Sequence, residues 1–333
     1  MEKAFVNRLQ CEKIGKLIGT TDIRSSFYNR EFLSFDTERE IKLRVYFISA
    51  AICHQTHTLY HPKLNLWGWY FMEYTFLQMV KNRSALLNPG YLSICSNVDL
   101  RLHLQKSFSF DGDPTNCTLD RLDERLEMLL EICSIVKTRY KGSISSMIDG
   151  CNGRLINDGK GIYEVLAGFK AFSDPHKKKI TFFLKLATDA GLLQIRDPEN
   201  LVPIMDYHMM RVLLRMGCVE VKDLGLREGL LNKKMQASDE DIRAKCIEAI
   251  RIIAKKSGHG ILKMNDFLWP IGRSCCHEAT LCHDTKCMKE PCTFYSIVKI
   301  GSHKKCFFET ACLGNKDENY RKLWEPITET SYY

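Results

Sequence analysis

The sequence predicts a mainly α-helical protein, and three observations support this fold class. Between Thr118 and Thr138 apolar residues recur every three or four positions, as on one face of an amphipathic helix. A second helix is expected from Ser238, because acidic residues fill its first turn and lysines its last, and Gly258 and Gly260 follow. No stretch gives a convincing run of alternating apolar and polar residues, and no internal repeat is present.

Size and composition are those of an ordinary globular protein. The chain has 333 residues, 45% of them hydrophobic and 26% charged, so it can bury a core in one large domain or two closely packed ones. Its net charge of +8 permits an anionic partner without requiring one. No apolar run approaches the roughly 18 residues of a membrane span, and residues 1–16 lack a signal peptide's apolar core. We expect a monomer with no membrane partner, located in the cytoplasm, or in the nucleus if the source is eukaryotic.

Changes in composition divide the chain into three regions. Glycines are frequent over residues 139–160, which suggests a boundary between lobes. We therefore expect an N-terminal helical region over residues 1–150, a central region over 151–268 and a cysteine-rich tail over 269–333.

An aromatic-rich segment, residues 46–83, contains two expected buried helices with polar residues between them. His54 and Gln55 lie in that connection, close in sequence to Trp67 and Trp69. One interpretation is an aromatic core whose histidines cap helices. The other is a pocket wall, in which a ring stacks on an extruded base and Gln55 reads the edge of that base. On the second interpretation His54, Gln55, Trp67 and Trp69 are candidate substrate-binding residues.

Residues 174–217 join a lysine cluster to an aspartate, each placed directly before an apolar helical run. Three lysines at positions 177–179 open the first run, and Asp206 precedes the second, expected over residues 207–216. Asp is a favoured N-cap, and adjacent lysines suit a solvated turn. A lysine and a carboxylate at two helix starts that face one cleft also suit chemistry at a sugar carbon, as nucleophile or electrostatic stabiliser.

Around Asp206 the sequence resembles the helix-hairpin-helix DNA glycosylases of the endonuclease III superfamily. The segment Val-Asp-x-His-x-x-Arg-Val of that family aligns with Met205, Asp206, His208, Arg211 and Val212. The resemblance implies a two-lobed helical fold and a DNA N-glycosylase that flips a damaged base out of double-stranded DNA. It implies that Asp206 is catalytic, and that its neighbours Tyr207 and His208 contact the substrate.

Residues 174–185 resemble the lysine-bearing hairpin of the archaeal 8-oxoguanine DNA glycosylases. The lysine that this match assigns is Lys179. It implies a catalytic amine that forms a Schiff base with the sugar and allows strand cleavage, which is abasic-site lyase activity. Residues 166–169 show only a faint resemblance to the Leu-Pro-Gly-Val-Gly hairpin of endonuclease III.

Seven of the fifteen cysteines lie between Cys275 and Cys312. In a chain expected to stay reduced, this density indicates a metal site rather than a disulfide framework, with unligated thiols as the alternative. The candidate ligands are Cys275, Cys276, Cys282, Cys287 and Cys292, and Cys306 or Cys312 could replace one of them. Four such thiolates can enclose a [4Fe-4S] cluster or bind tetrahedral zinc. The iron–sulfur loop of endonuclease III-like glycosylases follows the glycosylase core in the same way, and this resemblance favours the [4Fe-4S] cluster.

Two alternatives to a DNA glycosylase stay open. Residues 206–217 also resemble queuosine salvage proteins, and residues 265–269 resemble the Asp-Tyr-Tyr-Leu-Trp segment of those proteins. This resemblance implies an N-glycosidase that acts on a free modified nucleotide or nucleoside. The other alternative is a non-catalytic nucleic-acid-binding protein whose iron–sulfur cluster is structural.

Overall fold

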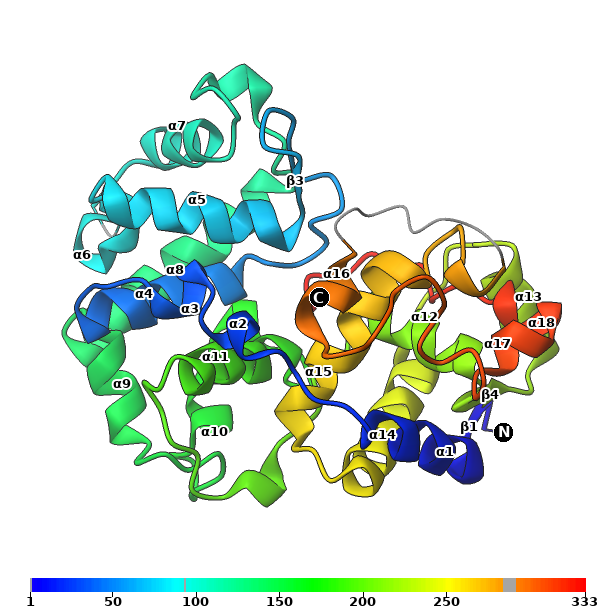
Figure 1. The fold of residues 1–333 in the computed structure, drawn as a ribbon. Helices are drawn as coiled ribbons and strands as arrows, with labels where there is room; N and C mark the ends of the chain where they lie inside the picture. The colour runs from blue at the N-terminus through cyan, green and yellow to red at the C-terminus, as the bar shows by residue number, and fades with distance from the viewer. Residues whose placement is uncertain (1, 93, 284–291) are drawn as a thin grey trace. The chain divides into compact units, whose positions relative to one another are not determined.

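The computed structural model describes residues 2–92, 94–283 and 292–333, and helices dominate it (Figure 1). This confirms the prediction of a mainly α-helical protein. No helix in the described ranges has both the length and the apolar character needed to cross a membrane. The chain forms two compact units: Met1–Asn29 with Val202–Glu329 is the first, and Arg30–Leu201 with Thr330–Tyr333 is the second. The three regions expected from the composition, residues 1–150, 151–268 and 269–333, stay predictions.

The first unit is built around helix α14 (Glu240–Ser257), against which α1 (Arg8–Ile18) packs closely (Figure 1). A Cβ atom added at Gly15 would lie 2.8 Å from the backbone oxygen of Ile253, so only glycine lets the two helices approach this far. The other helices of this unit are α2 (Ser25–Tyr28), α12 (Tyr207–Met216), α13 (Leu224–Leu231), α15 (Ile261–Pro270), α16 (Thr293–Ile297), α17 (Leu313–Lys316) and α18 (Glu318–Arg321). A π-helical turn, Ile271–Cys275, continues α15, and a 3₁₀ turn spans Leu281–His283.

Strand β1 (Ala4–Val6) pairs antiparallel with β4 (Val219–Val221), and Phe5 lies opposite Glu220. No pattern in the sequence indicates this pair, because three residues are too few to show an alternation. The pairing joins the first residues of the chain to the segment that directly follows α12.

Helix α4 (Arg39–Ala51) lies at the core of the second unit and contacts α11 (Lys178–Asp189). Residues 45–51 are all buried, as expected for a helix with neighbours on every side. The ring of Phe47 packs against three other phenylalanine rings, those of Phe169, Phe172 and Phe183. These contacts hold α11, and the segment that precedes it, against α4.

The remaining elements of the second unit surround this pair of helices. Its other helices are α3 (Glu31–Ser34), α5 (Trp69–Lys81), α6 (Pro89–Leu92), α7 (Asn97–Ser107), α8 (Leu122–Tyr140), α9 (Ile144–Gly150) and α10 (Ile162–Leu166). The strands β2 (Tyr60–His61) and β3 (Leu66–Trp67) form a hairpin. Short 3₁₀ turns span Ala85–Leu87, Pro114–Asn116, Lys170–Phe172 and Pro198–Asn200.

Helix α8 begins four residues later than the sequence pattern predicts. The predicted first residue, Thr118, and the buried Leu119 belong to the preceding segment. Arg121 has a φ of 49°, in the left-handed region, so the chain turns there and the helix starts at Leu122. Two other predicted helices agree closely, since α14 ends before Gly258 and α12 spans residues 207–216.

Candidate active site

Asp206 is held at the start of α12 in the first unit. Its side chain accepts a hydrogen bond of 3.0 Å from the backbone N–H of Met209, which makes it the N-cap of the helix. Only 7% of the residue is exposed. The partial positive charge of a helix start favours the anionic form of a carboxylate at this position. The predicted N-cap is therefore confirmed, and the side chain is largely withdrawn from solvent.

The two residues after Asp206 are packed beside it on α12. Burial, together with the charges of Asp206 and Glu325, raises the pKa of the Tyr207 phenol, so this side chain is neutral at ordinary pH. The His208 ring packs edge-on against Trp269 of α15, with ring centroids 6.2 Å apart. A Cβ atom at Gly272 would lie 2.5 Å from the backbone oxygen of His208, so the turn after α15 closely approaches this part of α12.

Arg211, which aligns with the arginine of the glycosylase motif, has a structural position. It is fully buried, and its Nη1 lies 2.5 Å from Oε2 of Glu325. Its guanidinium also donates to the backbone oxygens of Gly272, at 2.6 Å, and Cys276, at 3.1 Å, and packs over the ring of Trp324. One side chain thus ties α12 to the turn after α15 and to the C-terminal segment.

Lys179 is fully buried in the second unit, near the start of α11. Its Nζ donates to the backbone oxygen of Ala51 at 2.5 Å and lies 3.2 Å from Nδ1 of His54. Burial, together with the positive charges of Lys178 and Arg125, lowers the pKa of Lys179 to about 7. A substantial fraction of the amine is therefore neutral near pH 7.

The interpretation of the three lysines as a solvated turn is wrong for two of them. Lys177 has a left-handed φ of 57° and precedes the helix. Lys178 is 7% exposed, and its Nζ lies 3.5 Å from Sγ of Cys53 and over the ring of Phe182. The apolar neighbours in α11 draw the start of the helix into the core, because Ile180, Phe183 and Leu184 are all completely buried.

His54 and Gln55 lie together in the segment after α4. His54 is completely buried, and both Lys179 and Arg125 approach its Nδ1. Gln55 has a left-handed φ of 41°, and its side-chain oxygen accepts from Nη1 of Arg121 at 2.5 Å. His54 therefore contacts the buried amine of Lys179, and the side-chain amide of Gln55 is hydrogen-bonded to Arg121.

The two tryptophans of the aromatic segment differ in their surroundings. Trp67 is 39% exposed and stacks on Tyr60, with ring centroids 3.8 Å apart. Trp69 donates from Nε1 to Glu73 at 2.7 Å, and its ring packs edge-on against Phe182. Of the two candidate stacking rings, Trp67 is the more accessible one, whereas Trp69 is half-buried and packed against Phe182.

The candidate residues fall into two groups by unit. Asp206, Tyr207 and His208 belong to the first unit. Lys179, His54, Gln55, Trp67 and Trp69 belong to the second. Lys179 and Asp206 belong to different units, so their sharing of one cleft stays a prediction.

Sequence reasoning missed two residues that complete the surroundings of Lys179. Arg125 and Glu124 both lie on α8, and both carry charges that act on Lys179. Arg125 sits within the apolar stripe of this helix, three residues after Leu122 and four before Leu129. A charge in that position is the signal that could have identified it as a buried, partnered residue.

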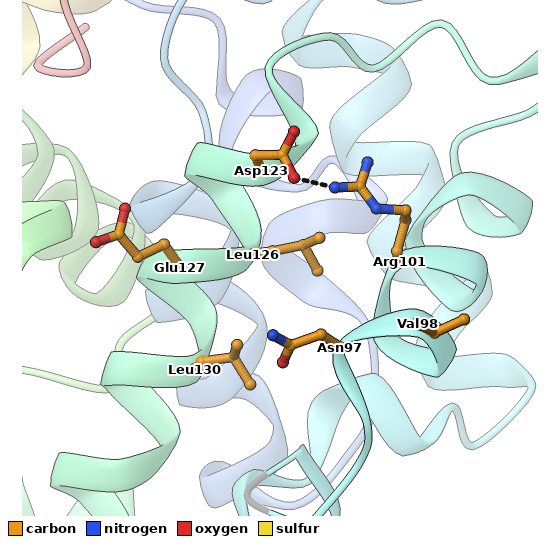
Figure 2. Close-up of a pocket in the computed structure, with 7 residues that line it drawn as sticks. All are labelled: Asn97, Val98, Arg101, Asp123, Leu126, Glu127 and Leu130. Carbon is orange, nitrogen blue, oxygen red and sulfur yellow. Dashed lines mark hydrogen bonds and ion pairs between the residues drawn. The ribbon is translucent and has the colours of Figure 1, made fainter.

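A pocket of about 260 Å³ lies between α7 and α8 in the second unit (Figure 2). It is lined by Asn97, Val98, Arg101, Asp123, Leu126, Glu127 and Leu130. Figure 2 shows Arg101 of α7 reaching toward Asp123 of α8, with which it forms an ion pair. The candidate catalytic and substrate-binding residues are not part of its lining.

Two thiols of the cysteine-rich tail are in direct contact. The sulfurs of Cys275 and Cys292 lie 3.6 Å apart, close to the roughly 3.8 Å expected for two thiolates on one tetrahedral zinc. Cys287 lies outside the described residues. Within those residues, no group of three or more His, Cys, Asp or Glu side chains is arranged to hold a metal ion. The contacting pair fits two ligand positions of such a site.

Four further thiols of the tail influence one another. Burial and the thiols of Cys276, Cys312 and Cys282 raise the pKa of Cys306. Arg215 of α12 contacts two of them, because its Nη1 lies 3.5 Å from Sγ of Cys276 and its backbone oxygen lies 3.5 Å from Sγ of Cys312. Cys306 and Cys312, the possible replacement ligands, therefore lie near two of the candidate ligands.

No protein-family model matches the sequence, and no curated protein gives a significant match to it. The resemblance to DNA glycosylases therefore depends on the motif residues themselves and on the chemistry that their positions allow.

Proposed function

We propose that this protein is a DNA N-glycosylase that excises a damaged or modified base, with Asp206 as its central catalytic residue. The observation that carries the proposal is the buried carboxylate at the start of α12. It stands at the motif position at which the helix-hairpin-helix glycosylases have their catalytic aspartate. The two-lobed glycosylase fold and its helix-hairpin-helix belong to the same proposal, with the hairpin between α10 and α11.

Asp206 would act on the charge that develops as the glycosidic bond breaks. Departure of the base with the bonding electrons leaves positive charge on the sugar ring. A carboxylate fixed by the N–H of Met209 needs little reorganisation to stabilise that charge or to orient the attacking group. The base must first leave the duplex, and an exposed ring such as that of Trp67 suits stacking on a flipped base.

Lys179 would supply the lyase part of the activity. A neutral amine attacks the anomeric carbon of the sugar and the base departs, which gives a Schiff base that permits strand cleavage by elimination. The lowered pKa of Lys179, about 7, supports this role because attack requires the unprotonated amine. Lys179 is buried in the present structure, so the role also requires the substrate to gain access to it.

A second candidate function is hydrolysis of a free modified nucleotide or nucleoside. The contact between His208 and Trp269 favours it, because it brings together the two segments that resemble queuosine salvage proteins. Aromatic rings beside a buried carboxylate suit a small nucleobase as well as a flipped one.

The test compares the two substrate classes directly. Purified protein is incubated with duplexes that each carry one oxidised or alkylated base, and separately with the matching nucleosides. Alkali-labile strand breaks and released bases are then measured. The proposal predicts base release from a duplex and duplex binding that weakens steeply with salt. Release only from nucleosides would select the second candidate, and binding without release in every case would leave a non-catalytic nucleic-acid-binding protein.

The proposal includes a metal in the cysteine-rich tail, a [4Fe-4S] cluster or zinc, with Cys275 and Cys292 among its ligands. Such a site supplies fold stability and positions the tail, as structural metal sites do. We expect anaerobically purified protein to contain iron with a broad visible band, or zinc without one.

Single substitutions test which thiols hold the metal. Cys275→Ala and Cys292→Ala should each lower the metal content measured by elemental analysis. Cys133→Ala, which removes a completely buried thiol of α8, is the matched control and should leave the metal content unchanged. Equal metal content in all variants would exclude the pair as ligands.

A further inference from the structure

His54 lies between the buried amine of Lys179 and a carboxylate at the edge of the second unit. Its Nδ1 is 3.2 Å from Nζ of Lys179, and its Nε2 is 3.5 Å from Oε2 of Glu124. The Lys179 and His54 side chains are completely buried, whereas that of Glu124 is 26% exposed. The three groups therefore form a line from the interior to solvent, all within the second unit.

The neighbours of His54 determine which of its nitrogens carries the proton. When Lys179 is an ammonium, both groups near Nδ1 are donors: this ammonium and the guanidinium of Arg125 at 3.4 Å. Nδ1 must therefore accept, and the proton resides on Nε2, facing Glu124. Burial and the charges of Lys179 and Arg125 strongly lower the pKa of His54, so the imidazole is neutral.

We infer that His54 and Glu124 form the proton path through which the Lys179 ammonium becomes a nucleophilic amine. This inference rests on the role of Lys179 in the proposed function. His54 and Glu124 act through Lys179 and are positioning residues for it.

The transfer can be written so that every proton is accounted for. Nζ of Lys179 gives one proton to Nδ1 of His54, while Nε2 of His54 gives its own proton to Oε2 of Glu124. The products are a neutral amine, a neutral imidazole in its other tautomer and a carboxylic acid, which releases its proton to water. The contact between His54 and Glu124 must shorten by about 0.5 Å to reach a normal hydrogen bond.

Charged and titratable groups from three elements face this path. Lys178 lies on α11, Cys53 follows α4, and Arg121 and Arg125 lie at and within α8. Arg121 contacts Glu124 at 2.6 Å, so the carboxylate is paired with a cation in the resting state. The negative charge of Glu124 also favours the protonated form of Lys179, because it acts to raise the pKa of that amine.

The effect of the Glu124 charge on the pKa of Lys179 allows a proton path to be distinguished from simple electrostatics. If Glu124 acted only through its charge, Glu124→Gln would lower the pKa of Lys179 and increase the neutral fraction of the amine at pH 6. Covalent trapping would then become faster. If the proton leaves through Glu124 and its departure limits the rate, the same substitution makes trapping slower, since glutamine cannot accept the proton.

The experiment measures the rate at which sodium cyanoborohydride traps the protein on a duplex with one abasic site, from pH 6 to pH 8. We expect trapping by the wild type, none by Lys179→Gln, and a rate lowered roughly 10²-fold at pH 6 in Glu124→Gln. His54→Phe should show a similar loss. Glu127→Gln, one turn further along α8 with a side chain 63% exposed, is the matched control and should trap at the wild-type rate.

Each other outcome has a distinct meaning. Faster or unchanged trapping by Glu124→Gln would overturn the proton path while Lys179 kept its role. Base release by the wild type without any trapping would overturn the path and the lyase role, and would leave the proposed function of Asp206 standing. Glu124 is partly exposed, so Glu124→Gln should fold like the wild type even if the buried substitution His54→Phe destabilises the protein. Urea unfolding of each variant checks this.

Discussion

At the scale of single residues, Asp206 and Lys179 occupy similar places in the sequence, but only one of the two environments could be predicted from it. Asp206 and Lys179 each lie near the start of a helix whose apolar residues draw it into a core. The N-cap at Asp206 follows from local chemistry and could be predicted. The burial of Lys179 could not, because it depends on α4 and α8, which are distant in sequence.

Because the Lys179 amine is buried, the stability of the wild type relative to Lys179→Met should increase with pH. The folded-state pKa of Lys179 is about 7 and the ordinary value is 10.5. Between these values the unfolded chain binds a proton that the folded chain does not, so this group makes folding more favourable as pH rises. Relative to Lys179→Met, the wild type should gain roughly 1 kcal/mol per pH unit between pH 7 and pH 10.

Urea unfolding of both proteins at several pH values measures this gain, and other titrating groups cancel in the difference. Below pH 7 the buried amine is charged and its full cost lowers the stability of the wild type. The difference in unfolding free energy between the wild type and Lys179→Met should therefore be constant there. A difference that stayed constant up to pH 10 would show that the amine is not desolvated.

At the scale of elements, α12 is fixed at both ends. Asp206 caps its start, and Gly217 ends it with a φ of 75°. A Cβ atom at Gly217 would lie 2.3 Å from Cδ1 of Leu313 at the start of α17, so this glycine also allows close packing. Helix limits of this kind can be predicted from sequence, whereas the contact with α17 cannot, because nothing local marks Leu313 as its neighbour.

Two glycine substitutions should separate these effects. Gly258, after α14, has a similar φ of 76°, and a Cβ atom added there would meet no other atom within 4 Å. Gly258→Ala should therefore cost about 1 kcal/mol of unfolding free energy, for the left-handed backbone alone. Gly217→Ala should cost clearly more, because Leu313 must also move. Equal losses in urea unfolding would show that the contact with α17 is absent.

The link between α12 and the C-terminal segment gives a further prediction. Removing the carboxylate of Glu325 leaves the guanidinium of Arg211 buried without its counter-charge. Glu325→Ala should lower the unfolding free energy by roughly 3–5 kcal/mol. Glu318→Ala, which removes an exposed carboxylate paired with Lys322, is the control and should cost less than about 1 kcal/mol. Similar losses in the two variants would contradict the structural role given to Arg211.

At the scale of the whole molecule, local sequence patterns predicted the fold class and several helices, but they did not predict the two discontinuous units. Amphipathic periodicity and caps predicted α12 and α14 because both signals are local. Each unit joins segments that are far apart in the sequence, as in the pairing of β1 with β4. Such long-range pairing depends on the complete core, which no short motif encodes.

The central claim is that the carboxylate of Asp206 stabilises the breaking glycosidic bond. Asn retains the capping hydrogen bond of Asp but not its charge, so Asp206→Asn should fold normally. Asp223→Asn is the matched control, because Asp223 caps α13 with the same hydrogen-bond pattern but is exposed. The measurement is the single-turnover rate of base release from a damaged duplex that the wild type accepts. We expect a rate lowered roughly 10²–10³-fold in Asp206→Asn and unchanged in Asp223→Asn. An undiminished rate in Asp206→Asn would show that its carboxylate is not catalytic.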